Sequence, residues 1–260
     1  MFSVVVVFKY LLKKILNVKI IFNYRTPLHF VCRYGSDQCG EVVEYLIDKG
    51  ACVNCSDVYG LHPLHFCAMR GNLTACQILF NSPNITKKPL DLQNCTPLHL
   101  AATYGYVCIS YLLIFDIPVG IYLVCEGYYF YLFSQVEVAK KLLEEDSSSL
   151  NHASNDTRLP IHNACQVGCF EIVELILNST EDIADNGYQS QFKQIDLGDN
   201  SGETPLALAV NIGSTKIVEM LLENHNANPS IADSSHTYPI HNAAKSGNVE
   251  ILKLLLEVRI

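Results

Sequence analysis

Apolar residues recur at spacings of three and four positions in six separate stretches of the chain, which is the spacing of one face of an α-helix. Ile172, Leu175 and Ile176, for example, fall on one such face. The six stretches read EVVEYLIDKG, LTACQILF, VEVAKKLLEED, FEIVELILN, TKIVEMLLEN and VEILKLLLE. The pattern therefore predicts amphipathic helices separated by turns, and an all-α fold.

A tetrapeptide pattern precedes each of these stretches. Its copies read TPLH, HPLH, TPLH, LPIH, TPLA and YPIH, and they begin at Thr26, His62, Thr96, Leu159, Thr204 and Tyr238. The spacings between copies are 36, 34, 63, 45 and 34 residues, so the underlying period is 34 and two intervals are markedly longer. A fixed period of this length predicts a repeat architecture.

Proline and glycine punctuate every copy at the same places. The prolines are Pro27, Pro63, Pro97, Pro160, Pro205 and Pro239, and the glycines are Gly35, Gly71, Gly105, Gly168, Gly213 and Gly247. Proline suits the first turn of a helix, and glycine suits the left-handed residue that ends one. Each copy therefore predicts a short first helix, a turn at the glycine, and a second helix. Small residues inside the first helix, such as Ala101 and Ala164, would let neighbouring helices approach closely.

This unit resembles the ankyrin repeat. The resemblance covers residues 25–260 apart from insertions, and it implies a solenoid of about six helix-turn-helix repeats joined by short β-hairpin-like finger turns. The family's D-x-x-G finger turn matches Asp57 to Gly60 and Asp199 to Gly202, with Asn94 in place of the glycine after Asp91. Two further fingers carry Thr157 and His236 in place of the glycine.

An apolar insert, residues 107–135, interrupts the third repeat, and its removal restores a 34-residue interval. A transmembrane helix needs about 20 apolar residues, whereas Asp116, Pro118 and Glu126 break this stretch. A hydrophobic surface loop is the second interpretation, although it would favour aggregation. The third is a retained intron, since the codons for Val107–Cys108 and for 133–135 can form splice signals. We favour the third interpretation as a hypothesis.

The two ends of the chain extend the same hypothesis. Residues 1–24 form an apolar and basic leader without a signal-peptide cleavage site, and we do not expect this leader to belong to the native domain. Codons for Val258–Arg259 can also form a splice donor. We therefore expect a fragment of a longer protein.

Composition argues against several classes of partner and cofactor. The net charge is −8 and no Lys/Arg cluster lies beyond the first 25 residues, so a nucleic-acid partner is not expected. The 11 cysteines are odd in number and irregularly spaced, which predicts reduced, mostly buried thiols in the cytosol. Cys52 and Cys55 form one CxxC motif, but no second pair completes a zinc site.

The histidines also have a structural interpretation. His29, His65, His99, His162 and His241 each occupy the same position of a repeat. Equivalent positions in packed helices lie on the order of 10 Å apart, which is too far for shared metal coordination. The resemblance implies hydrogen bonds within and between repeats for these rings. We expect no catalytic residue, no metal site and no cofactor, and hence no enzyme.

The expected function is a protein-protein interaction module, with a protein partner in the concave groove of the solenoid. The candidate partner-binding residues lie near the finger tips: Tyr59, Asn94, Asn200 and Ser234.

The second and third repeats, GLHPLHFCAMRGNLTACQILF and DLQNCTPLHLAATYGY, also resemble the amino-terminal repeats of ankyrin-type (TRPA) transient receptor potential cation channels. That resemblance implies a cytoplasmic array without a membrane span in the repeats, joined to the membrane through a channel domain outside this chain. The alternatives are a free-standing cytosolic scaffold or adaptor, and the repeat part of a signalling enzyme whose catalytic domain lies elsewhere.

Overall fold

The computed structural model describes residues 23–35, 39–104, 135–184 and 195–257. Most of the leader, Gly105 and residues 107–134 of the insert lie outside these ranges. The chain divides into two compact units, residues 1–149 (unit 1) and 150–260 (unit 2), which are described separately below.

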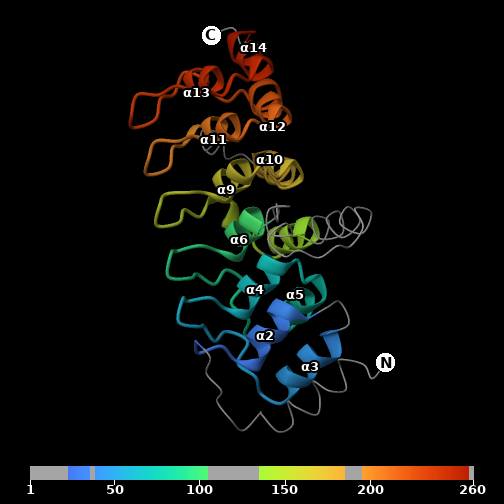
Figure 1. Cartoon of the computed structure of the whole chain (residues 1–260). Helices are drawn as coiled ribbons and strands as arrows, with labels where there is room; N and C mark the ends of the chain where they lie inside the picture. The colour runs from blue at the N-terminus through green and yellow to red at the C-terminus, as the bar shows by residue number, and fades with distance from the viewer. Residues whose placement is uncertain (1–22, 36–38, 105–134, 185–194, 258–260) are drawn as a thin grey trace, which may run out of the picture. The chain divides into compact units, whose positions relative to one another are not determined.

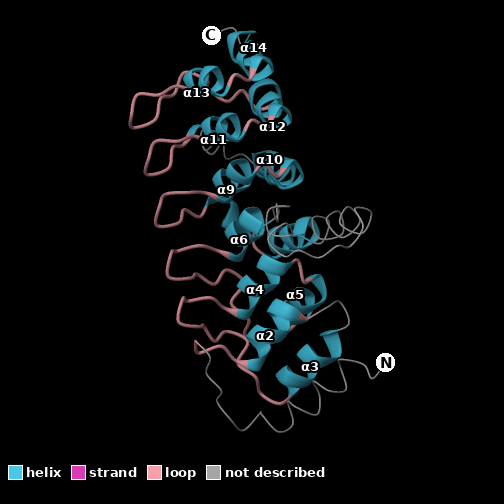
Figure 2. Cartoon of the chain, viewed as in Figure 1, coloured by secondary structure: helices cyan, strands magenta, loops and turns pink. Residues whose placement is uncertain are grey.

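The described residues of both units form helices and turns, with no β-strand among them (Figure 2). Unit 1 contains α2 (Pro27–Tyr34), α3 (Gly40–Asp48), α4 (Pro63–Arg70), α5 (Leu73–Phe80), α6 (Pro97–Tyr104) and a helix over 135–145, and η2 (Ser147–Asn151) follows. Unit 2 contains α9 (Pro160–Val167), α10 (Phe170–Ala184), α11 (Pro205–Ile212), α12 (Thr215–Glu219), its π-helical continuation η4 (Met220–Asn224), α13 (Pro239–Ser246) and α14 (Val249–Glu257). These pairs confirm the predicted helix-turn-helix repeats.

The first helix of each repeat begins at its proline, as the sequence predicts. Four of these helices end at a left-handed glycine: Gly71, Gly168, Gly213 and Gly247 have φ of 66°, 77°, 80° and 69°. The prediction is wrong for Gly35, whose φ of −66° and ψ of 139° are extended. A Cβ on Gly35 would lie 2.5 Å from the Val31 carbonyl oxygen and 2.6 Å from the Cys39 Sγ. Glycine is needed there because a side chain would collide with the end of its own helix and with Cys39, and not for a left-handed turn.

Within each unit the first helices pack against one another in chain order, α2 on α4 on α6 and α9 on α11 on α13 (Figure 1). The predicted small residues lie at these contacts, because Cys67, Ala101, Ala164, Ala209 and Ala243 are all at most 1% exposed. Second helices pack likewise, α3 on α5 and α12 on α14. Each repeat therefore buries its apolar face against the next one in its unit.

The fingers are the turns that connect a second helix to the next first helix, and within each unit they project to one side of the helices (Figure 2). In the finger at Asp57, the carboxylate Oδ1 accepts hydrogen bonds from the backbone N–H of Tyr59 at 2.9 Å and of Leu61 at 3.0 Å. Asp91, Asp199 and Asp233 accept the equivalent pairs of bonds. A carboxylate thus holds each of these four turns closed.

One residue of each finger has a left-handed backbone. Gly60 and Gly202 have φ of 77° and 75°, and Asn94, Thr157 and His236 have φ of 59°, 57° and 59°. These values confirm that the three residues stand in for glycine. Thr157 is the most strained of them because it is β-branched, and its hydroxyl donates a hydrogen bond to the Asn200 Oδ1 at 3.2 Å.

Neighbouring fingers are joined by backbone hydrogen bonds. In unit 1 the Val58 N–H donates to the Asn23 carbonyl at 3.1 Å, and the Leu92 N–H donates to the Tyr59 carbonyl at 3.0 Å. In unit 2 the corresponding bonds run from Asn200 to Asp156 at 3.0 Å and from Ser234 to Ser201 at 2.8 Å. A side chain at the turn could keep the backbones of two neighbouring fingers apart. A Cβ on Gly60 would lie 2.7 Å from the Leu92 nitrogen, and one on Gly202 would lie 2.9 Å from the Ser234 nitrogen.

Gly60→Ala should therefore destabilise the chain more than Gly247→Ala. Both glycines are left-handed, so both variants should lose about 1–2 kcal/mol from the backbone conformation. Only Gly60 lies against the backbone of the next finger, whereas nothing lies within 4 Å of a Cβ on Gly247. Urea melts of the two variants measure the difference, and equal losses of unfolding free energy would contradict the finger-to-finger contact.

Deleting the segment that interrupts the third repeat should raise solubility and sharpen unfolding. Gln135 is buried at the start of the 135–145 helix, and its Nε2 donates to the Met69 carbonyl at 2.8 Å. Deletion of 107–135 and deletion of 106–134 both leave a 34-residue interval, but only the second keeps Gln135. We expect the second variant to be the more stable in thermal melts. Loss of helical structure in both variants would contradict the intron hypothesis.

Candidate functional site

The finger tips are defined here as the two residues before each left-handed finger residue: Val58–Tyr59, Leu92–Gln93, Asn155–Asp156, Asn200–Ser201 and Ser234–Ser235. Of the four predicted binding residues, Tyr59, Asn200 and Ser234 lie at tips and are exposed, and the Tyr59 side chain is 56% exposed. Asn94 is instead the half-buried left-handed residue of its finger.

The Asn200 side chain already bridges two fingers, because its Nδ2 donates to the Asn155 carbonyl at 3.2 Å and its Oδ1 accepts from Thr157. Asn94 and Asn200 thus help to build the fingers, and Tyr59 offers the largest apolar surface of the four predicted residues.

Two tip residues escaped the sequence analysis. Leu92 is 65% exposed and Val58 is 39% exposed, next to Tyr59. The Leu92–Tyr59 backbone bond fixes the two tips side by side. We call Val58, Tyr59 and Leu92 the apolar tips of unit 1. A comparison of the two middle positions of D-x-x-G among the repeats would have found them, since the equivalent residues of unit 2 are all polar.

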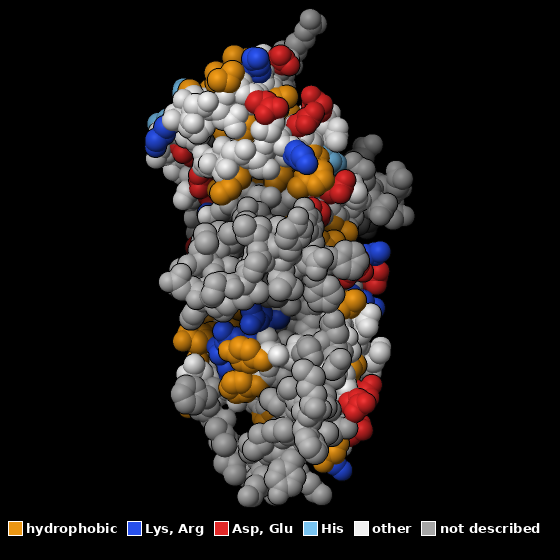
Figure 3. All heavy atoms as spheres, turned by 45° about the vertical axis from the view of Figure 1, so that its right-hand side comes forward, with side chains coloured by type: hydrophobic (Ala, Val, Ile, Leu, Met, Phe, Trp, Pro, Cys, Tyr) orange, Lys and Arg blue, Asp and Glu red, His pale blue; other side chains and the backbone are white. Residues whose placement is uncertain are grey.

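Elsewhere the visible surface is mixed. Figure 3 shows one face of the molecule, on which the hydrophobic side chains of the described residues form small groups among charged and polar atoms. Exposed apolar residues on a fixed turn, such as the apolar tips, are thus more distinctive than any broad patch on this face.

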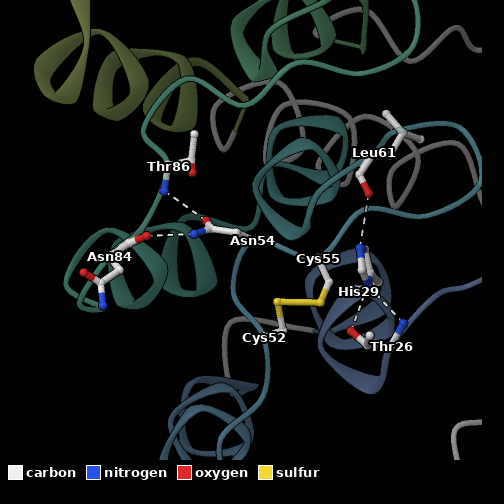
Figure 4. The surroundings of a disulfide bond; sticks show 8 residues. All are labelled: Thr26, His29, Cys52, Asn54, Cys55, Leu61, Asn84 and Thr86. Carbon is white, nitrogen blue, oxygen red and sulfur yellow. Dashed lines mark hydrogen bonds between the residues drawn. A yellow bond between two sulfur atoms is a disulfide. The ribbon is translucent and has the colours of Figure 1, made fainter.

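The repeated histidines hold their repeats together, as the resemblance implies. The Nδ1 of His29 accepts from the Thr26 backbone N–H at 3.0 Å, and its Nε2 lies 3.1 Å from the Leu61 carbonyl in the next finger (Figure 4). His65 and His162 make the same two contacts. Each Nδ1 accepts from the backbone N–H three residues earlier, and the Nε2 atoms lie 3.1 Å from the Cys95 carbonyl and 2.9 Å from the Leu197 carbonyl, respectively. This arrangement needs a neutral ring that accepts at Nδ1 and donates at Nε2.

Burial keeps these rings neutral. It lowers the pKa of His65 to about 3 and lowers the pKa of His29 and of His162, in each case against the opposing effect of the carbonyl that faces the ring. Both ring nitrogens of each histidine are engaged by the backbone, so none of the three is placed to act as a general base. In the fifth repeat, which has Ala207 in place of histidine, the Thr204 hydroxyl oxygen accepts the Ala207 N–H at 3.2 Å.

Ion pairs of equivalent placement brace a finger in each unit. The Arg25 Nε lies 2.9 Å from the buried Asp57 carboxylate, and the Arg158 Nε lies 2.8 Å from that of Asp199. Each arginine comes from the finger that precedes its partner aspartate. These pairs stabilise successive fingers, and the geometry offers them no substrate.

The cysteines of the described residues comprise one disulfide pair, six buried thiols and the half-buried Cys95. Six thiols are buried in the described residues, Cys32, Cys39, Cys67, Cys76, Cys165 and Cys169. Burial raises the pKa of Cys169 to about 11 and also raises the pKa of Cys67, Cys76 and Cys165, so these thiols are poor nucleophiles. The prediction of reduced thiols throughout is wrong for Cys52 and Cys55, which form a disulfide. Sequence spacing alone could not decide between a dithiol and a disulfide.

Neither a metal-ion site nor a membrane-spanning helix occurs in the described residues. In those ranges no three His, Cys, Asp or Glu side chains group as a metal-ion site. Within the same ranges, none of the helices combines the length and hydrophobicity needed to span a bilayer.

Acid should destabilise the chain through its buried histidines. The pKa of His65 is about 3 when folded, against 6.5 for a free histidine. The unfolded state therefore binds more protons below pH 6.5, and stability present above that value is lost as the pH falls toward 3. His65 alone should cost about 2 kcal/mol at about pH 5. Urea melts at about pH 7.5 and pH 5 should show this loss in the wild type.

His65→Gln supplies the control for that prediction. The variant should be less stable at about pH 7.5, but its stability should change less between the two pH values because the buried titrating ring is gone. An unchanged pH dependence in His65→Gln would contradict the assignment.

The sequence matches the family model for ankyrin repeats (three copies) over residues 5–91, 43–122 and 186–260. It is 28% identical over 237 residues to ankyrin repeat protein nuc-2 of Neurospora crassa, covering 90% of this chain and 18% of that protein. Mouse rabankyrin-5 is 28% identical over 198 residues, covering 76% of this chain and 13% of that protein.

Human transient receptor potential cation channel subfamily A member 1 is 26% identical over 224 residues, covering 84% of this chain and 16% of the channel. The chain thus spans less than a fifth of each of these three relatives. From the helical repeats, the finger turns and the match to the family model, we conclude that the chain belongs to the ankyrin-repeat family.

Proposed function

We propose that the chain is a non-catalytic module that binds a protein partner, and that the apolar tips of unit 1 are central to the contact. The observation that carries this proposal is the placement of Tyr59 and Leu92, 56% and 65% exposed, on adjacent fingers joined through their backbones. Aromatic and large apolar side chains on a rigid scaffold provide binding energy with little loss of entropy. We keep the predicted concave surface, lined by fingers and first helices, as the region where the partner lies.

For the parent protein, we propose a TRPA-like cation channel in which this chain is part of a cytoplasmic repeat array. The resemblance of the second and third repeats supports this proposal, and so does the 84% of this chain that aligns with the human channel. Membrane association would then come from a channel domain outside these residues.

A free-standing cytosolic scaffold is the second candidate. The similarity to nuc-2 and to rabankyrin-5 favours it, because neither protein is named as a channel. Sequencing the spliced transcript beyond both ends separates the two. Several apolar spans after the repeats support the channel, and a stop codon supports the scaffold.

The apolar tips should crosslink to the partner. A photoreactive amino acid at position 59 or 92 should capture a specific protein in the source cells, whereas one at Glu44, exposed on α3, should not. The double variant Tyr59→Ser/Leu92→Ser should abolish capture from a probe at the neighbouring Gln93. Its urea melt should match the wild type, because both side chains are largely exposed. Equal capture from probes at positions 59, 92 and 44, or capture from Gln93 that survives the double substitution, would contradict the proposed surface.

A further inference from the structure

The Cys52–Cys55 disulfide lies in the loop between α3 and the finger at Asp57 (Figure 4). Cys52 is exposed and Cys55 is half-buried. Their Cα atoms are 5.5 Å apart, which is within the range that a disulfide bridges without backbone movement. Among the described cysteines this pair differs from the six buried thiols, which solvent oxidants do not reach. Cys95 is a free, half-buried thiol. Among the described residues, Cys52 and Cys55 are therefore the accessible cysteines that a disulfide joins.

Of the two residues between the cysteines, Asn54 connects two successive repeats. The Asn54 Nδ2 donates to the Asn84 carbonyl at 2.7 Å, and its Oδ1 accepts from the Thr86 N–H at 2.9 Å (Figure 4). Asn84 and Thr86 belong to the equivalent loop of the next repeat, 30 and 32 residues further along. The disulfide encloses Asn54 in a small ring and so restricts the backbone that presents this amide.

Unit 2 makes the equivalent connection without a disulfide. There the Asp196 Oδ1 accepts from the Asn228 N–H at 2.8 Å, also across 32 residues. The loop-to-loop bond therefore does not require a disulfide. A ring this short also gives little stabilisation through chain entropy, which grows with loop length. The repeat fold thus accounts for Asn54 but leaves the two cysteines unexplained.

We propose that Cys52 and Cys55 are a reversible dithiol–disulfide site whose redox state controls how firmly Asn54 holds the next repeat. The oxidant would be a low-molecular-weight disulfide of the glutathione class. The exposed Cys52 thiolate attacks one sulfur of that disulfide, forms a mixed disulfide and releases one thiolate. The Cys55 thiolate then attacks the Cys52 sulfur and releases the second. Two electrons and two protons pass to the oxidant, which becomes two thiols.

A redox titration of the whole 260-residue chain tests this proposal. The chain is equilibrated in buffers with increasing ratios of oxidised to reduced glutathione, quenched in acid, unfolded and then alkylated. Tryptic peptide 50–70 contains Cys52, Cys55 and the buried Cys67, which serves as an internal reference. As the buffer becomes more oxidising, we expect the alkylated fraction of Cys52 and of Cys55 to fall together in one two-electron step. The alkylated fraction of Cys67 should not change.

Cys52→Ser and Cys55→Ser should each trap a mixed glutathione disulfide on the remaining cysteine, and Cys95→Ser should titrate like the wild type. A pair that stays oxidised, or stays reduced, at every ratio would overturn the proposal, as would stoichiometric zinc bound by the reduced pair.

Hydrogen exchange tests the structural consequence separately. On reduction the Thr86 amide, which donates to Asn54, should exchange several-fold faster, and the Asn228 amide, which donates to Asp196, should not change. Equal exchange of the Thr86 amide in both redox states would show that the pair does not act on this contact. Because neither measurement uses a binding partner, the outcome is independent of the proposed function.

Discussion

Within each unit, the other contacts between neighbouring fingers depend on a backbone hydrogen bond from one finger to the finger before it. Val58, Leu92, Asn200 and Ser234 donate these bonds at 2.8 to 3.1 Å. The preceding finger turns back through a left-handed residue in each case. This residue is Gly60 for the Leu92 bond and Gly202 for the Ser234 bond, where a Cβ would crowd the donor. It is Tyr24 for the Val58 bond and Thr157 for the Asn200 bond. In the finger at Asp57, the aspartate that closes the turn, the Arg25 side chain that reaches it and the His29 ring that faces the Leu61 carbonyl all act on the same junction. Asp199, Arg158 and His162 do the same in unit 2.

The helices could be predicted because their ends are fixed by local chemistry. A proline at the first helical position and a glycine after the last act through φ alone, so sequence suffices at Gly71, Gly168, Gly213 and Gly247. Gly35 shows where this reasoning stops. The same residue type in the same register is extended there, and a side chain would collide with the Val31 carbonyl and with Cys39. Sequence identifies that a glycine is needed, but the surrounding atoms decide for which reason.

The candidate site was less predictable because exposure depends on neighbouring repeats. Tyr59 could be picked out as an aromatic residue in a turn, but Asn94 and Asn200 could not be recognised as structural without the hydrogen bonds and backbone angles that occupy them. Leu92 carries no signal by itself, and in the sequence only the polar residues at the same position of the unit 2 fingers mark it as unusual. The finger-to-finger bond then places it beside Tyr59. The Cys52–Cys55 pair was similarly ambiguous, since CxxC spacing suits a dithiol, a metal ligand pair and a disulfide.

Native-state hydrogen exchange at the finger tips tests the central claim most directly. The four donor amides, those of Val58, Leu92, Asn200 and Ser234, lie on projecting turns where an unbonded N–H would exchange at the rate of an unstructured peptide. We predict that all four amides are protected, and that they exchange only when the repeats of their unit open. Exchange of these amides at the unstructured rate, while the first helices remain protected, would show that the fingers are independent loops and would contradict the account.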